Sequence, residues 1–225
     1  VLIDEYGKVR RSLPVDRIRL YEDHFAHSSR EIIPIMTETQ RRFAQELGLP
    51  QANYYRGTRR EGGGVGISHR DRLENIDPRN VQVVACTDSH TPTLGALPLL
   101  PIPVGSTMGA VAIAEGKIPY TASPVLRINL TGDLPPGHSI RDAQLEMGAI
   151  CKPVRTGMVV EYGGDGLSSL TFDQVAALCN MVPEMVKAET AVTEAFSAGI
   201  NYLMDKYGMS SSEASHRLQE QGLPS

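Results

Sequence analysis

Short stretches of alternating apolar and polar residues recur along the chain. Residues 17–21 and 126–131 alternate strictly, which is typical of strands with one solvated face. A short apolar run of Val81, Val83, Val84 and Ala85 is typical of a buried strand, and residues 157–162 have the composition of a further strand. The pattern therefore predicts a strand in each of these four segments.

Apolar residues at helical spacing fill much of the chain between these strands. Helices are predicted over 37–47, 106–115 and 184–205, the first opened by a capping box of Thr37 and Gln40. Further helix starts are predicted from capping boxes at Ser139 to Asp142, Thr171 to Gln174 and Ser210 to Glu213. Strands that alternate with helices along the whole chain predict an α/β fold with parallel or mixed sheets. A loop near residues 119–124 divides it into two small α/β domains, 1–122 and 123–225.

Composition and charge narrow the classes of partner. Twenty-two basic and 26 acidic residues leave a net charge of −4, which argues against a nucleic-acid-binding surface. No apolar run approaches the ~18 residues that span a bilayer, so no membrane is expected. The three cysteines are Cys86, Cys151 and Cys179. An odd, widely spaced set does not make a disulfide framework, which indicates a reducing cytoplasm.

The most informative segment is Asp88-Ser89-His90, which directly follows the 81–85 strand. Ligands of open α/β sheets bind at the carboxyl ends of strands, and titratable groups there are candidates for acid–base catalysis. Successive residues on an extended chain point to opposite sides, so these three do not form a serine-protease triad. Asp88 and Ser89 capping a following turn is the structural alternative, and it stays open.

Three further strand or loop ends carry titratable groups, namely Asp23-His24, His69 and Glu161. A carboxylate beside a histidine can orient the ring and favour an imidazolium that protonates a leaving hydroxyl. Any one of these ends is unremarkable, but four of them together predict an acid–base site.

These residues lie in motifs that resemble the aconitase family, most of all the large subunit of isopropylmalate and homoaconitate dehydratases. The matching motifs, in order, are Asp23-His24, Gly66-Ile67-Ser68-His69, Cys86 to Leu97, Val104 to Thr107, Asn129 to Gly132, Val160-Glu161-Tyr162 and Leu178 to Met181. The resemblance covers roughly residues 15–205. It implies an aconitase-like fold of two small three-layer α/β domains. It also implies a lyase, a dehydratase or isomerase, that acts on a small hydroxy- or oxo-carboxylic acid.

The resemblance divides the expected site into two groups of residues. The catalytic group is Asp23, His24, His69, Asp88, His90 and Glu161. The substrate-binding group is Thr87, Ser89 and Asn180. In this scheme Asp23 and His24 form a carboxylate–imidazole pair that acts on the substrate hydroxyl.

The chain also departs from that family. Family members hold a [4Fe-4S] cluster on cysteines of a Gly-Ser-Cys-Thr-Asn-Ser motif and a Cys-x-x-Cys motif, and neither motif occurs here. Cys86 and Cys179 match family positions that are not ligands, so this chain alone is expected to bind no cluster. A mononuclear metal on His24, His69 and His90 is an alternative.

Three functions agree with these observations. The first is a lyase that works by general acid–base catalysis without its own cluster. The second is one half of a split large subunit whose partner supplies the cluster cysteines. The third is a non-catalytic remnant or assembly partner. Besides the carboxylic acid, the expected partners are a small swivelling-domain subunit or a cluster-bearing subunit, because both regions are expected to lie outside this chain.

Overall fold

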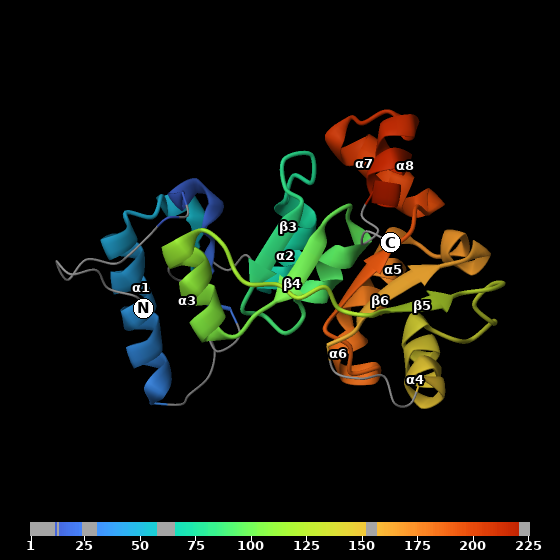
Figure 1. The fold of residues 1–225 in the computed structure, drawn as a ribbon, viewed down its shortest axis with the longest axis horizontal. Coiled ribbons are helices and arrows are strands. Elements are labelled where there is room, and N and C mark those ends of the chain that lie inside the picture. Colours follow the sequence, from blue (N-terminus) through green and yellow to red (C-terminus); the bar gives the residue numbers. More distant parts are fainter. Residues whose placement is uncertain (1–11, 13, 24–30, 58–65, 152–156, 221–225) are drawn as a thin grey trace. The chain divides into compact units, whose positions relative to one another are not determined.

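The computed structural model describes residues 12, 14–23, 31–57, 66–151 and 157–220 (Figure 1). Contacts divide the chain into two compact units, one of Val1–Asp71 with Gly105–Tyr120 and one of Arg72–Val104 with Thr121–Ser225. This division differs from the predicted one, because it groups residues 72–104 with the C-terminal part of the chain and residues 105–120 with the N-terminal part. The domains 1–122 and 123–225 therefore stay a prediction. Within the described part of the chain, no helix combines the length and the apolar character needed to cross a membrane.

The first unit is built on helices α1 (Ile32–Leu47) and α3 (Ser106–Glu115). Helix α1 contains the predicted 37–47 helix and begins earlier, whereas α3 has the predicted bounds. Each helix ends at a glycine with positive φ, 65° at Gly48 and 70° at Gly116. A left-handed residue at this position lets the last carbonyls accept backbone hydrogen bonds, which is why both helices stop where glycine occurs.

The first unit also contains a short parallel sheet, in which β1 (Leu20–Tyr21) pairs with β2 (Tyr54–Tyr55). Strand β1 is shorter than the predicted strand over 17–21. Residues Val15–Arg17 instead form a 3₁₀ turn, into which the amide of Ile18 donates at 3.1 Å. Backbone groups that are paired inside a turn cannot also join a sheet, so the strand begins only after the turn.

The second unit contains two parallel sheets. Strands β5 (Val125–Asn129), β6 (Val159–Gly163) and β7 (Thr190–Thr193) lie in the order β5-β6-β7. Strand β3 (Val83–Cys86) pairs with β4 (Leu100–Pro103). Parallel neighbours need crossover connections, and α4 (Ile140–Ile150) and α5 (Phe172–Asn180) lie in the connections of the three-stranded sheet. The prediction of an α/β fold with parallel sheets is confirmed.

Three of the four helix starts that capping boxes predicted are present. The fourth, at Thr37 and Gln40, is wrong, because both residues lie inside α1, which begins at Ile32. Ser139 with Asp142 opens α4, and Thr171 with Gln174 opens α5, each pair bonding reciprocally. At α8 (Ser211–Glu220) the Ser210 hydroxyl accepts the amide of Glu213 at 3.2 Å. These side chains satisfy amides that the first turn of a helix leaves without partners.

The predicted helix over residues 184–205 is wrong. The segment holds the short helix α6 (Val182–Met185), strand β7 and only then helix α7 (Ser197–Tyr207). All four residues of β7 are buried, and they pair with the buried strand β6. A strand buried on both faces has no polar side to mark its period, so the apolar spacing resembled a helix.

Two expectations about single strands also need correction. Strand β3 exists, but it is not buried, because Val83 is 54% exposed. Glu161 was expected to end its strand, whereas it is the middle residue of β6. Its backbone pairs on one side with Arg127 of β5 and on the other with Val192 of β7, which extends the strand to Gly163.

A 3₁₀ helix, η4 (Thr91–Ala96), follows the end of β3 and is buried at all six residues. A side chain at Gly95 would collide with the backbone carbonyl of Ala191 in β7. The hydroxyl of Thr193 donates to the Gly95 carbonyl at 3.4 Å. Close packing against β7 thus fixes η4, and with it the residues that precede it.

Candidate functional site

The loop from β3 into η4 carries the residues that the sequence singled out. The Asp88 side chain is only 4% exposed, and its Oδ1 accepts the backbone amide of His90 at 2.8 Å. The Asp88 carbonyl accepts the Thr91 hydroxyl at 2.5 Å. Asp88 therefore does cap the following turn, and this arrangement holds the His90 backbone beside its carboxylate. Thr87 and Ser89 are exposed on the same loop.

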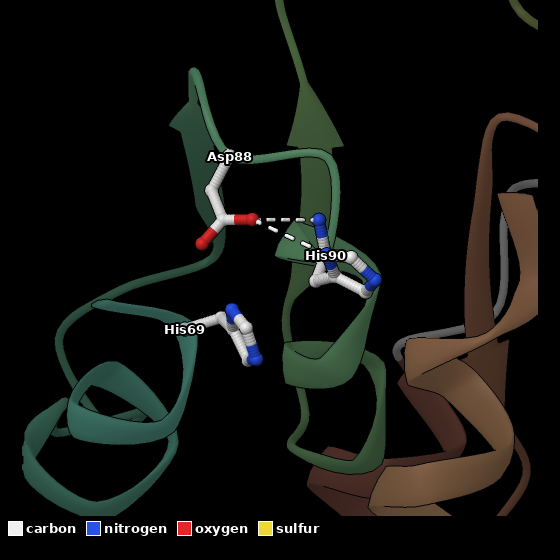
Figure 2. A group of neighbouring side chains, drawn as sticks. All are labelled: His69, Asp88 and His90. Carbon is white, nitrogen blue, oxygen red and sulfur yellow. Dashed lines mark hydrogen bonds and ion pairs between the residues drawn. The ribbon is translucent and has the colours of Figure 1, made fainter. Parts of the chain in front are cut away.

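Both ring nitrogens of His90 face polar partners. Nδ1 lies 3.2 Å from the Ser89 hydroxyl and 3.7 Å from Asp88 Oδ1, and Figure 2 shows this Asp88–His90 pair. Nε2 lies 3.4 Å from Oε1 of Glu184, on α6. The His90 side chain is 29% exposed, so the ring is held by the loop but remains accessible to a small molecule.

Glu184 is the residue of this site that sequence reasoning missed. The spacing of Glu184 from Asn180 gave no signal for it, because α5 ends at Asn180 and α6 begins at Val182, so the two residues do not share one continuous helix. Asn180 is hydrogen-bonded to η4, which follows the loop that carries His90. Its Nδ2 donates to the Thr93 hydroxyl at 2.8 Å, and that hydroxyl donates to the His90 carbonyl at 2.6 Å.

His69 is the second residue of helix α2 (Ser68–Asn75). The division between the two units falls inside this helix, after Asp71, so that His69 and the buried Leu73 are parts of one continuous helix. One ligand atom each of His69, Asp88 and His90 lies within 4.8 Å of the other two (Figure 2). The structure thus brings together three of the six predicted catalytic residues.

Asp23 caps the N-terminus of α2. Its Oδ2 accepts the backbone amide of Ser68 at 2.7 Å, next to His69 in the chain. A carboxylate is favourable at this helix end because the first amides are unpaired and the helix dipole is positive there. The preceding strand supports the same helix, since the Tyr21 hydroxyl donates to Asp71 Oδ2 at 2.5 Å. His24, the predicted partner of Asp23, lies outside the described residues.

Glu22, between Tyr21 and Asp23, is a buried anchor with a side chain only 6% exposed. Its oxygens accept Nε and Nη2 of Arg41 at 2.8 and 3.0 Å, and also the Tyr54 hydroxyl and the Gly57 amide. Burial would raise the pKa of Glu22, but the hydrogen bonds from Arg41, Tyr54 and Gly57 outweigh burial and lower it. Burial and the Glu22 carboxylate raise the pKa of Tyr54.

Glu161 has different neighbours from those expected. Arg127 lies opposite it in register, and Nη1 of Arg127 donates to Glu161 Oε1 at 2.5 Å, while Nη2 donates to Glu194. The contacts described for Glu161 are thus with a guanidinium on β5. The carboxylates described beside His90 belong to Asp88 and Glu184. A catalytic role for Glu161 stays a prediction.

The three cysteines, all of them among the described residues, do not gather into one group of potential metal ligands. Cys179 is completely buried in α5, and burial raises the pKa of its thiol, which disfavours the thiolate that ligates iron. Cys86 ends β3 and Cys151 follows α4. Among the described residues, the one group of three potential metal ligands, His69, Asp88 and His90, contains no cysteine.

Known proteins are similar to this chain over most of its length. The model of the aconitase family (aconitate hydratase) matches residues 10–222. The 3-isopropylmalate dehydratase large subunit 1 of Methanopyrus kandleri is 27% identical over 197 residues, which are 87% of this chain and 42% of that protein. The 3-isopropylmalate dehydratase large subunit of Helicobacter hepaticus is 30% identical over 197 residues, 87% of this chain and 45% of that protein.

A third relative matches over a shorter stretch of this chain. The mitochondrial homocitrate dehydratase of Saccharomyces cerevisiae is 34% identical over 125 residues, which are 55% of this chain and 16% of that protein. This chain spans less than half the length of each of these three relatives.

Proposed function

The chain belongs to the aconitase family, and on that premise we propose that it supplies acid–base groups for a hydro-lyase or isomerase of small hydroxy- or oxo-carboxylic acids. The names of its relatives support this reaction class, since they are dehydratases of isopropylmalate and homocitrate. The observation that carries the proposal is the position of His90 between two carboxylates, Asp88 and Glu184.

The proposed dehydration requires two proton transfers at the site. Dehydration breaks a C–H bond, whose proton passes to a base, and a C–O bond, whose oxygen leaves as water after an acid protonates it. A neutral His90 ring can take up the proton released from the C–H bond, and the carboxylates of Asp88 and Glu184, one beside each ring nitrogen, would stabilise the imidazolium that forms. We assign the proton transfer at carbon to this group. The hydroxyl is assigned to Asp23 and His24, as the resemblance implies.

His69, Ser89, Thr87 and Asn180 complete the proposed site. His69 belongs with the Asp88–His90 pair because of the 4.8 Å grouping. Thr87 and Ser89 are exposed on the loop that presents His90, where they could meet substrate carboxylates or hydroxyls. Asn180 is proposed to act in addition through its bond to Thr93, which steadies that loop.

Glu184 and Glu161 are both candidates for a carboxylate that works with His90, and single substitutions distinguish their roles. We expect Glu184→Gln to lower kcat by about 10²-fold or more with little change in folding, because it replaces the carboxylate beside Nε2 with an uncharged amide that cannot stabilise an imidazolium. The matched variant Glu161→Gln leaves the Arg127–Glu194 pair intact and is expected to have the smaller effect. Turnover of isopropylmalate, citrate and related acids, measured on the assembled protein, checks this. A Glu184→Gln protein with full turnover would contradict the proposal for Glu184.

The cofactor is proposed to come from outside this chain or to be unnecessary. In the first case a partner polypeptide supplies the cluster cysteines, and a small swivelling-domain subunit completes the enzyme. The large-subunit names of the relatives support such a partner. In the second case the acid–base groups act on a substrate whose proton is already acidic. A non-catalytic assembly partner is the remaining alternative.

A single metal ion bound by this chain is an alternative to the iron–sulfur cluster, and it can be tested directly. Two imidazoles and a carboxylate are common ligands of divalent transition metals. If His69, Asp88 and His90 hold one ion, calorimetric titration with Zn²⁺ should give one site per chain that Asp88→Asn abolishes. His216→Gln, which changes an exposed histidine of α8, should leave that site unchanged. Zinc binding that survives Asp88→Asn would count against this site. Iron and sulfide analysis of anaerobic preparations tests the cluster separately.

A further inference from the structure

The C-terminal end of helix α2 is held by two tyrosines from a distant part of the sequence. The Tyr202 hydroxyl donates to the carbonyl of Leu73 at 3.3 Å, and the Tyr207 hydroxyl donates to the carbonyl of Ile76 at 2.7 Å. The last carbonyls of a helix have no partner within the helix, so these hydroxyls satisfy groups that would otherwise need water. Both tyrosines lie on α7, roughly 130 residues further along the chain.

The tyrosines are themselves held rigidly. The Tyr202 ring stacks on the Phe172 ring, with ring centroids 3.8 Å apart. The Tyr207 ring lies edge-on to the Tyr202 ring, with a centroid separation of 6.3 Å. Nζ of Lys206 donates to the Tyr202 hydroxyl at 2.9 Å and lies 5.1 Å from the centre of that ring. Burial raises the pKa of Tyr207, so its phenol keeps the proton that it donates.

The opposite end of the same helix carries His69. His69 and Leu73 are four residues apart and therefore lie on one face of α2, separated by about 6 Å along its axis. The Leu73 side chain is 1% exposed in the core of the second unit. Any movement of the α2 C-terminus relative to that core is transmitted through one helical turn to the His69 ring.

We infer that Tyr202 and Tyr207 are positioning residues, which hold α2 in register and thereby set where the His69 imidazole lies. This inference rests on the role of His69 in the proposed function. It assigns to α7 a part in the site although no residue of α7 is among those proposed to touch the substrate. The hydroxyls carry the effect, because the rings can keep their stacking without them.

The test uses the full chain with Tyr202→Phe, Tyr207→Phe and the double substitution. Phenylalanine keeps the ring contacts with Phe172 and removes only the donors to α2. Ser139→Ala is the matched control, because it removes part of the cap of α4, a comparable local bond whose two partners, Ser139 and Asp142, lie outside α2. The first readout is amide hydrogen exchange of residues 70–76. The second is the NMR resonance of the His69 ring, assigned by its absence in His69→Gln.

The double variant is expected to exchange its α2 amides about tenfold faster than the wild type, and to shift the His69 resonance, while Ser139→Ala does neither. In the assembled enzyme it should lower kcat by about 10- to 100-fold with little change in KM, since binding groups stay in place while one reacting group moves. Unchanged α2 exchange and an unchanged His69 resonance in the double variant overturn the inference, as do changes matched by Ser139→Ala. Full turnover by His69→Gln would instead remove His69 from the proposed function and leave the exchange result standing.

Discussion

His90→Gln is expected to lower turnover by about 10²- to 10⁴-fold, the range that a lost general acid or base accounts for. Glutamine can occupy much of the same volume but cannot take up and release a proton near neutral pH. The fold should survive, because Asp88 bonds the backbone amide at position 90 and the ring is 29% exposed. Steady-state kinetics and a melting curve on the same preparations check both halves of this result.

His216→Gln is the control for this experiment. His216 also pairs with a glutamate, at 3.2 Å from Glu220, but both side chains are largely exposed on α8. It should retain wild-type turnover and stability, because exposed pairs of this kind contribute little. If His90→Gln turned over substrate at the wild-type rate, His90 would be a structural residue of the turn and nothing more.

Glu22→Gln is expected to destabilise the first unit by about 3 kcal/mol. The substitution leaves Arg41 without its carboxylate and turns an amide group toward the Gly57 amide or the Arg41 guanidinium. The estimate lies at the lower end for a broken buried ion pair, because the Arg41 side chain is 28% exposed. Urea unfolding followed by tyrosine fluorescence measures the loss, since Tyr21 and Tyr54 lie at the site.

The same pair predicts how stability depends on pH. The pKa of Glu22 is lower in the folded chain than its ordinary value of 4.5, so folding favours the ionised carboxylate. The stability that it adds is complete above pH 4.5 and disappears as the pH falls through the lower folded-state pKa. The difference between wild type and Glu22→Gln should therefore shrink below pH 4.5.

Glu46→Gln makes the same chemical change in an exposed pair and serves as the control. Glu46 faces Arg42 at 3.8 Å on the surface of α1, with both side chains more than half exposed. The expected loss is about 0.3 to 0.5 kcal/mol. Equal losses in Glu22→Gln and Glu46→Gln would show that the buried network adds no more than a surface pair.

Local features were predictable from the sequence because the atoms that make them are neighbours in the chain. The caps of α4 and α5 depend on side chains three residues apart, Ser139 with Asp142 and Thr171 with Gln174. The end of α3 depends on one glycine, Gly116. The turn at Asp88 is equally local, so the capping interpretation could be drawn from the sequence and is confirmed, while a catalytic role for Asp88 stays a prediction.

The sequence by itself thus determined the α/β alternation, most helix ends and the motif that presents His90, since short-range sterics and hydrogen bonding decide these. Only the tertiary structure decided that residues 190–193 form a strand, because their burial beside β6 overrides an ambiguous apolar spacing. It also decided that Glu184 approaches His90 while Glu161 pairs with Arg127. Which side chains meet across such separations depends on sheet order and helix packing, and these long-range contacts leave no periodic trace in the chain.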